Sequence, residues 1–156
     1  MNSFSEVFAN SGDFWAFMGA AIAFLLAGIG SSKGVGIAGE AASGVVAEDP
    51  DKFVPVMILE ALPSTQGIYG FVIAFMILGR TGGLSIEGGL FILMAALPIA
   101  FVGLVSGIIQ GRVAAASIGI VAKRSDALVK GIVLTLMVEL FALFAFLVSM
   151  QIIGRV

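Results

Sequence analysis

Cysteine and histidine are both absent from this sequence, and charged residues are few. Without cysteine the chain can form neither disulfide bonds nor thiolate metal sites, and without histidine it lacks the commonest metal ligand. Aspartate, glutamate, lysine and arginine together make up 12% of the residues, about half the share that soluble domains carry. Because there is also no stripe of basic residues, we expect no nucleic acid among the partners.

Most of the sequence consists of long apolar segments. Four of them are visible, at about residues 14–47, 53–79, 87–122 and 126–153. Each reaches the roughly 20 residues that a membrane-spanning helix needs, and none shows the alternation of barrel strands. Short polar breaks join them, so that consecutive helices should be antiparallel neighbours. We predict an all-α membrane protein with four transmembrane helices in a single membrane domain, 1–156.

The second half of the sequence repeats the first. Segment 28–44 matches segment 103–119, with Gly28 aligned on Gly103 and Gly44 on Gly119. The second and fourth helices match at a slightly smaller offset, which places Gln66 opposite Glu139. The repeat runs twice in the same direction, so it is a parallel repeat. We therefore predict a duplicated helical hairpin, with the two hairpins at residues 14–79 and 87–153.

The four helices are of two kinds. The first and third hold most of the 21 glycines, with GxxxG spacings such as Gly103–Gly107–Gly111 that let helix backbones approach closely. The second and fourth are rich in phenylalanine and other bulky residues. This favours a homo-oligomeric ring with small residues inside and bulky residues facing lipid, although packing within one four-helix unit would also explain the glycines. Lys33 and Arg112 lie on the small-residue helices, where they could pair with acidic residues such as Glu40 or line a ring lumen.

Lysine and arginine predict the orientation in the membrane. Most of them flank the breaks at 47–52 and 122–126, whereas Arg80 and Arg155 lie at the opposite ends of the helices. Cytoplasmic loops carry the excess of these residues. We therefore expect a multi-pass protein of the cell membrane with these two loops in the cytoplasm and both termini outside.

One carboxylate, Glu139, lies in the middle of the last apolar segment. A central acidic residue disfavours membrane insertion by roughly 2.5–3.5 kcal/mol, so it marks a functional site by default. Gln66 and Gln110 share its depth, since all three lie about 20 Å along their helices from the cytoplasmic loops. On the second helix Thr65 and Tyr69 share a face with Gln66, and the missing N–H of Pro63 can leave a backbone carbonyl free.

These residues form an oxygen-rich pocket, which suits a hard cation. Because the pocket holds one negative charge, a monovalent ion would leave it neutral, whereas a divalent ion would bury a positive charge. We favour Na⁺, with H⁺ as the alternative. A proton would need only Glu139, and the two glutamines would then have no role in binding it. The glutamines could also be plain hydrogen-bond partners between helices.

Three stretches resemble the membrane-ring proteolipid, often called the K or c subunit, of V-type and archaeal-type rotary ATPases. They are LPSTQGIYG at 62–70, IIQGRVAAA at 108–116 and LMVELFALFAF at 136–146. The bacterial sodium-translocating form is the most similar, and the resemblance covers nearly the whole chain. It implies Na⁺ ligands at the Leu62 backbone, Thr65, Gln66, Gln110 and Glu139, with Tyr69 hydrogen-bonded to the carboxylate.

The resemblance also implies a mechanism in which this chain breaks and forms no bonds, so it is not an enzyme by itself. Each protomer of a ring of identical copies takes an ion onto Glu139, and the neutralised site then passes through lipid as the ring turns. An arginine of a stator membrane subunit displaces the ion. ATP hydrolysis in a separate head drives the ring through a central-stalk subunit, which should contact the 47–52 and 122–126 loops.

Two other interpretations and one residue stay open at this point. A channel with Glu139 as its selectivity element is less favoured, because this residue lies on a phenylalanine-rich helix. A purely structural scaffold would leave the shared depth of the polar residues unexplained. Glu60, about 9 Å nearer the cytoplasm than Gln66, is either a protonated or hydrogen-bonded glutamate in a helix interface or a way-station for the ion.

Overall fold

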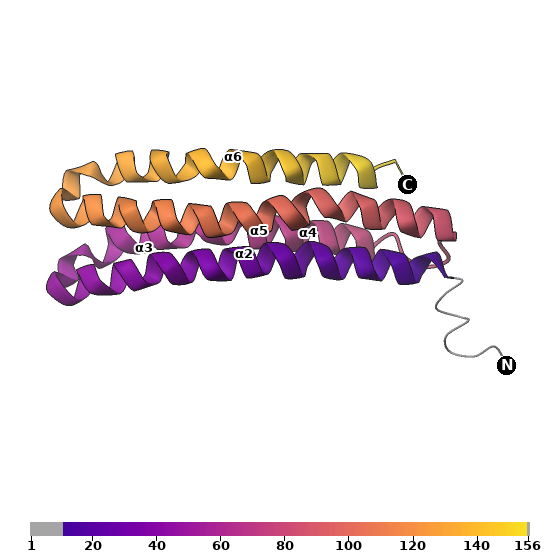
Figure 1. Ribbon diagram of the computed structural model, residues 1–156, viewed down its shortest axis with the longest axis horizontal. Coiled ribbons are helices and arrows are strands. Elements are labelled where there is room, and N and C mark those ends of the chain that lie inside the picture. The colour runs from indigo at the N-terminus through magenta and orange to yellow at the C-terminus, as the bar shows by residue number, and fades with distance from the viewer. Residues whose placement is uncertain (1–10, 156) are drawn as a thin grey trace.

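The computed structural model describes residues 11–155, which form an elongated bundle of antiparallel helices (Figure 1). Its elements are α2 (Gly12–Glu48), η1 (Pro50–Lys52), α3 (Phe53–Ala61), η2 (Leu62–Ser64), α4 (Thr65–Leu78), α5 (Ile86–Lys123), η3 (Ser125–Ala127) and α6 (Leu128–Ile153). Four helical segments of the described chain are long and apolar enough to cross a membrane. The prediction of an all-α protein with four transmembrane helices is confirmed.

The second of these segments is interrupted. Helices α3 and α4 are separated by the 3₁₀ turn η2, whose second residue is Pro63. Proline has no N–H to continue the α-helical pattern, and the chain tightens to a bond from the Thr65 N–H to the Leu62 carbonyl oxygen. The turn lies directly beside Thr65 and Gln66, so it sets where α4 begins to present these two side chains.

The small-residue helices α2 and α5 pack directly against each other. A Cβ atom added to Gly107 would come within 2.6 Å of the Gly30 carbonyl carbon, and one added to Gly30 within 2.7 Å of Leu104 Cα. Gly111 lies equally close to the backbone of Gly34. The glycine spacings are therefore explained by packing inside one four-helix unit, whatever larger assembly the unit joins.

The bulky helices α4 and α6 flank this pair. Helix α4 lies against α2, and α6 lies against α5. Large apolar side chains of α4 and α6 remain exposed, among them Phe75 and Phe141, at 68% each. Such a surface is stable only where lipid or another protein covers it.

Hydrogen bonds join segments that are distant in the sequence at both ends of the bundle. At one end the Asp13 carboxylate accepts hydrogen bonds from the N–H groups of Gly82, Gly83 and Leu84. Gly82 and Gly83 have φ values of +129° and +109°, a conformation that glycine adopts without strain. At the other end the Lys52 ammonium donates to the carbonyl oxygen of Ala122.

The buried core of the described chain is divided along the bundle. One apolar cluster includes Ala16, Ile73 and Ile99, and the other includes Leu59 and Ile118. The stretch between them contains buried polar side chains: Ser31, Gln66, Ser106 and Gln110. Because buried polar groups are unfavourable in lipid-spanning proteins unless they are satisfied, this layer is the candidate functional site.

Candidate ion-binding site

Glu139 lies half-buried on α6, and two other helices hold its carboxylate. The Tyr69 hydroxyl of α4 donates to Glu139 Oε1 at 2.6 Å. The Gln110 side-chain amide of α5 donates to Glu139 Oε2 at 3.3 Å. Each carboxylate oxygen therefore has its own donor, and hydrogen bonds to a charged acceptor are stronger than neutral ones. The arrangement turns the carboxylate inward, toward the middle of the bundle.

The two predicted glutamines meet each other in the core, and both side chains are 0% exposed. The Gln66 amide nitrogen donates to Gln110 Oε1 and, at 3.1 Å, to the Ser106 hydroxyl. The second hydrogen of the Gln110 amide goes to the Thr135 carbonyl oxygen at 3.3 Å. Every amide hydrogen is thus satisfied, as buried polar groups require, and the chain of bonds leads from Gln66 through Gln110 to Glu139.

Thr65 extends the chain of bonds to the backbone. Its hydroxyl oxygen lies 3.1 Å from the Leu62 carbonyl oxygen and 3.4 Å from Gln66 Oε1, so its one hydrogen can be donated to either acceptor. The Leu62 oxygen also accepts the Thr65 N–H. The 3₁₀ turn thus brings two donors to the Leu62 carbonyl oxygen, and the expectation that Pro63 leaves a carbonyl of the preceding turn free stays a prediction.

Ser106 and Thr135 belong to the cluster although the sequence did not single them out as site residues. The Ser106 hydroxyl accepts from Gln66 and lies 3.3 Å from the Val138 carbonyl oxygen, to which it donates. A signal for Ser106 existed, since it precedes Gln110 by four residues and so shares its helix face. Thr135 takes part through its backbone, which side-chain patterns do not reveal.

The electrostatics of the cluster suit a single positive charge. The described residues contain no group of three or more acidic or metal-ligating side chains that could hold a multivalent metal. Glu139 is the one carboxylate that the network reaches, and its neighbours are neutral amides and hydroxyls. A side-chain amide that flips presents its oxygen where its nitrogen stood, so Gln110 can exchange its donated hydrogen bond for a contact with a cation.

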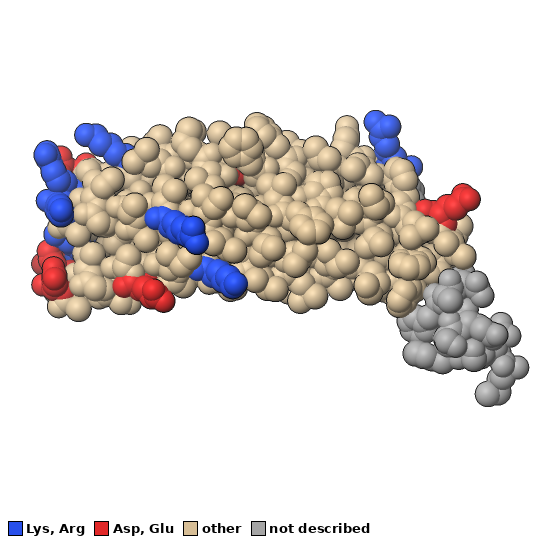
Figure 2. Space-filling view, viewed as in Figure 1, with Lys and Arg blue, Asp and Glu red and all other residues tan. Residues whose placement is uncertain are grey.

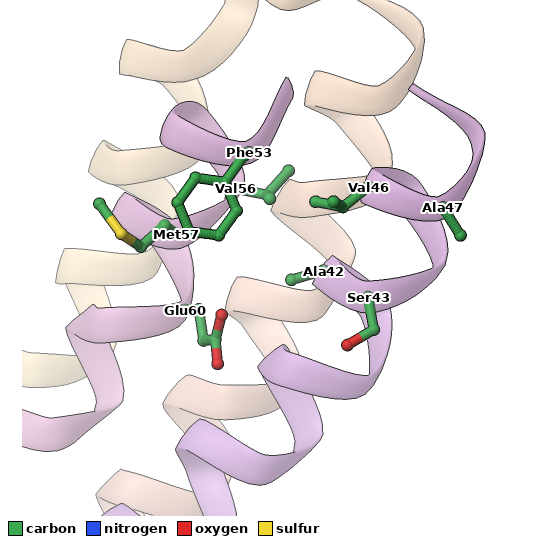
Figure 3. A pocket seen from close by; sticks show the side chains of 8 residues that line it. All are labelled: Ala42, Ser43, Val46, Ala47, Phe53, Val56, Met57 and Glu60. Carbon is green, nitrogen blue, oxygen red and sulfur yellow. The ribbon is translucent and has the colours of Figure 1, made fainter. Parts of the chain in front are cut away.

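Glu60 does not join this cluster. It lines a separate cavity of about 390 Å³ between α3 and the end of α2 (Figure 3). Its Oε1 lies 2.8 Å from where a Cβ on Gly39 would stand, so this glycine makes room for the carboxylate. Among residues 11–155 no side chain or backbone group forms a hydrogen bond or an ion pair with it.

Lys33, Glu40 and Arg112 are exposed and do not pair with one another. The ion pairs in the described part of the chain are Lys52–Asp49 and Arg124–Asp126. Figure 2 shows charged side chains gathered at the ends of the bundle, with a few others on the visible face of its apolar body. Within one copy these inner-helix charges therefore do not pair, and the expectation that they line a ring lumen stays a prediction.

Known proteins resemble the chain over most of its length. Residues 18–77 and 93–152 each match the family described as the C subunit of ATP synthase. The chain is 50% identical over 141 residues to the V-type sodium ATPase subunit K of Enterococcus hirae, covering 90% of each chain. It is 39% identical over 132 residues to the A-type ATP synthase subunit K of Methanocaldococcus jannaschii, covering 85% of this chain and 58% of the other.

A shorter relative shows the size of the repeat. The ATP synthase c subunit of Syntrophomonas wolfei is 40% identical over 67 residues, which is 40% of this chain and 93% of that protein. One hairpin here is therefore comparable to nearly the whole of that relative, and the twofold family match confirms the predicted duplication. The chain belongs to the family of the ATP synthase C subunit, as a member in which the family unit occurs twice.

Proposed function

We propose that this chain is the ion-carrying subunit of the rotor ring of a V-type sodium ATPase. The observation that carries the proposal is the hydrogen-bonded cluster in which Glu139, Gln110 and Gln66 meet between the two apolar halves of the core. A relative that matches 90% of the chain is named a V-type sodium ATPase subunit K. Identical copies form the ring, and other subunits supply ATP hydrolysis, the stator and the central stalk.

Each residue of the cluster has a part in holding the transported Na⁺. Glu139 supplies the negative charge, and Tyr69 keeps its carboxylate turned inward. Gln110 and Gln66 supply amide oxygens after their amides rotate, and Thr65 and the Leu62 carbonyl supply further oxygens when the threonine hydroxyl turns away. With one monovalent ion bound, the site has no net charge and can face lipid as the ring turns. An arginine of the stator then displaces the ion.

The surface of the bundle supports the placement of its helices in the ring. Lys33 and Arg112 are exposed on α2 and α5, and charges within a membrane avoid the hydrocarbon. We therefore assign the side of the bundle that carries Lys33 and Arg112 to the ring lumen. The phenylalanine-rich helices α4 and α6 are assigned to the lipid. This placement leaves Glu139 on the outer side, next to a stator, and disfavours a channel that uses it as a selectivity element.

The loops at 47–52 and 122–126 are assigned to the cytoplasmic side, where the central stalk would contact them, with both termini outside. A membrane-impermeant thiol reagent should label a cysteine at Asp49 only from the cytoplasmic side and a cysteine at Gly82 only from outside. Reversed labelling would overturn this orientation.

Labelling with a hydrophobic carbodiimide tests the transported ion. This reagent modifies a protonated, lipid-accessible carboxyl group, so Na⁺ bound at Glu139 should slow the reaction, whereas K⁺ should not. Glu139→Gln should abolish the labelling, and the matched control Glu60→Gln should leave both labelling and Na⁺ protection unchanged. If the reaction at Glu139 depends on pH alone and ignores Na⁺, the transported ion is H⁺.

A further inference from the structure

The hydroxyl group of Ser106 has two hydrogen-bond partners of different kinds. Ser106 lies on α5 and is 5% exposed. Its oxygen accepts a hydrogen from the Gln66 side-chain amide at 3.1 Å, and its own hydrogen is donated to the Val138 carbonyl oxygen at 3.3 Å. The Val138 oxygen only accepts. The Gln66 amide can either donate or accept, because it has a nitrogen on one side and an oxygen on the other.

The equivalent serine of the first hairpin has no such reversible partner. Ser31 accepts from the Gly67 backbone N–H at 2.7 Å, and a backbone N–H is always a donor. Ser31 and Ser106 are 7% and 5% exposed, so they differ in their partners and hardly in their burial. Of the two serines, only Ser106 therefore faces a group that has to turn during ion binding.

In the structure the Gln66 amide directs its nitrogen toward the other ligands of the candidate site. The nitrogen donates one hydrogen to Gln110 Oε1 and the other to Ser106, while the oxygen lies 3.4 Å from the Thr65 hydroxyl. We name this arrangement the donor orientation. Because the nitrogen carries two hydrogens and no acceptor, Gln66 cannot coordinate a cation at this place in the donor orientation.

Coordination of Na⁺ by Gln66 requires the reversed amide, which we name the acceptor orientation. The amide oxygen then occupies the place of the nitrogen and faces Gln110 and Ser106. The Gln66 side chain is already 0% exposed, and the oxygen and the nitrogen of an amide are so alike in size and shape that they are hard to tell apart by structure. The amide can therefore turn about its last bond without a shift of its neighbours.

Ser106 makes different numbers of hydrogen bonds in the two orientations. In the donor orientation it makes two, one accepted from Gln66 and one donated to Val138. In the acceptor orientation Gln66 offers it no hydrogen, and its single hydrogen goes either to the Gln66 oxygen or to the Val138 oxygen. The Val138 carbonyl lies inside α6, so it keeps its helical bond in either case. Ser106 therefore favours the donor orientation by one hydrogen bond.

We propose that Ser106 is a positioning residue that holds Gln66 in the donor orientation, weakens Na⁺ binding and so helps the site to release its ion. Ser106 does not coordinate the ion and acts through Gln66. A site on a rotor has to bind Na⁺ on one side of the membrane and give it up on the other, so excessive affinity would slow the ring. This inference rests on the proposed function and deepens it by naming a residue that sets the affinity.

Proton binding should not depend on Ser106. A proton binds to Glu139 itself, whose two carboxylate oxygens accept from Tyr69 and Gln110 and not from Gln66. Gln66 has no reason to turn when only a proton binds, so Ser106 keeps the same two hydrogen bonds. Removal of the Ser106 hydroxyl should therefore strengthen Na⁺ binding while leaving proton binding unchanged.

Na⁺ protection of Glu139 against a hydrophobic carbodiimide measures the effect in membranes. Ser106→Ala should need about 2–10-fold less Na⁺ for half protection than the wild type, the ratio that corresponds to one net hydrogen bond. Without Na⁺, labelling of the two proteins should follow pH with the same midpoint. The control Ser149→Ala removes a buried hydroxyl that accepts from the Ile99 N–H, toward the C-terminal end of α6, and should not change the Na⁺ concentration for half protection.

Two further variants separate positioning from packing. Ser106→Cys keeps the shape of the side chain with a group that forms only weak hydrogen bonds, so it should raise the Na⁺ affinity less than alanine does. It replaces Ser106→Ala if that variant fails to fold, as judged by pH-dependent labelling of Glu139. In a Gln66→Ala background, Ser106→Ala should not change the Na⁺ affinity further, because the amide through which Ser106 acts is gone.

Each other outcome overturns the inference. Unchanged Na⁺ affinity in both Ser106 variants would make the hydroxyl a plain link between helices, and lowered affinity would make it a support of the bound ion. Either result leaves the proposed function standing, because Na⁺ still protects Glu139. Absence of Na⁺ protection in the wild type would instead overturn the sodium function, and the inference about Ser106 with it.

Discussion

The two hairpins repeat one pattern, yet their equivalent residues Gln66 and Glu139 have different surroundings. Gln66 follows the 3₁₀ turn of the second segment and is 0% exposed. Glu139 lies in the uninterrupted helix α6 and is only half-buried. A group that exchanges ions with an outside partner needs access, whereas an amide that only coordinates can stay in the core. We infer that the two equivalent positions divide the work, one as a neutral ligand and the other as the charge.

A second equivalent pair shows how the site comes to lie between the hairpins. Ser31 accepts a hydrogen bond at 2.7 Å from the Gly67 N–H of its own hairpin. Ser106, its repeat partner, instead accepts from Gln66 of the other hairpin and donates to the Val138 carbonyl oxygen. One serine therefore holds α4 against α2, and the other joins the hairpins at the level of the candidate ion site.

Removing the charge of Glu139, or moving it to the equivalent position 66 of the other hairpin, should have the largest effect on Na⁺ transport. Glu139→Gln should abolish Na⁺ transport while the ring stays assembled, because the amide keeps the shape without the charge. The double exchange Gln66→Glu with Glu139→Gln should not restore transport, since position 66 is buried away from a stator. Transport assays in vesicles measure this, and recovery in the double exchange would show that the hairpins are interchangeable.

Buried and exposed glycines of the small-residue helices α2 and α5 should differ in what their replacement destroys. Gly107→Leu should prevent the chain from folding, because even a Cβ there would clash with the Gly30 backbone and overpacking typically costs about 1–3 kcal/mol or more. A leucine at Gly36 has open space within the chain. The Gly36→Leu variant should therefore fold normally, but it should assemble poorly. The yield of folded protein and the size of the purified complex distinguish the two variants. Equal behaviour would contradict the assignment of Gly107 to packing within a copy and of Gly36 to the surface of the copy.

Removing the neutral ligands should weaken Na⁺ binding without ending it. Gln66→Ala and Gln110→Ala should each reduce the Na⁺ affinity by at least about 10–100-fold, the scale found when groups that merely support the ligands of a metal site are lost. The loss should show as weaker Na⁺ protection against carbodiimide, most clearly at high pH, where protons compete least. Gln151→Ala, an exposed glutamine of α6 far along the chain from Glu139, is the control and should change nothing.

The smallest effect should come from the bonds that hold the start of α2 to the loop between the hairpins. Asp13→Asn removes the charge that accepts from Gly82, Gly83 and Leu84. This carboxylate lies at an exposed helix end, where water competes for its hydrogen bonds, so only a modest drop in thermal stability is expected. Na⁺ affinity should not change, and a change would reveal coupling between this end and the site.

Much of the candidate site can be predicted because depth in a membrane follows from the helix rise. Counting residues from the loops places Glu139, Gln66 and Gln110 at one level, and the structure joins them in one network. Such counting leaves Glu60 open, since depth does not say which cavity a side chain enters. It also misses Ser106 and the Thr135 carbonyl, because their roles depend on how α5 and α6 are turned toward each other.

Residue order alone was enough to predict the number of spanning helices, their duplication and the depth of the central carboxylate. Hydrocarbon forces the backbone to satisfy its own hydrogen bonds, so long apolar runs must be helices. Folding in three dimensions was needed to show that Gly107 and Gly111 pack within a chain, that the Leu62 carbonyl oxygen already has donors, and that Glu60 stands apart. A helix that is apolar on every side can rotate about its axis without changing its pattern, so its neighbours decide which way each polar group points.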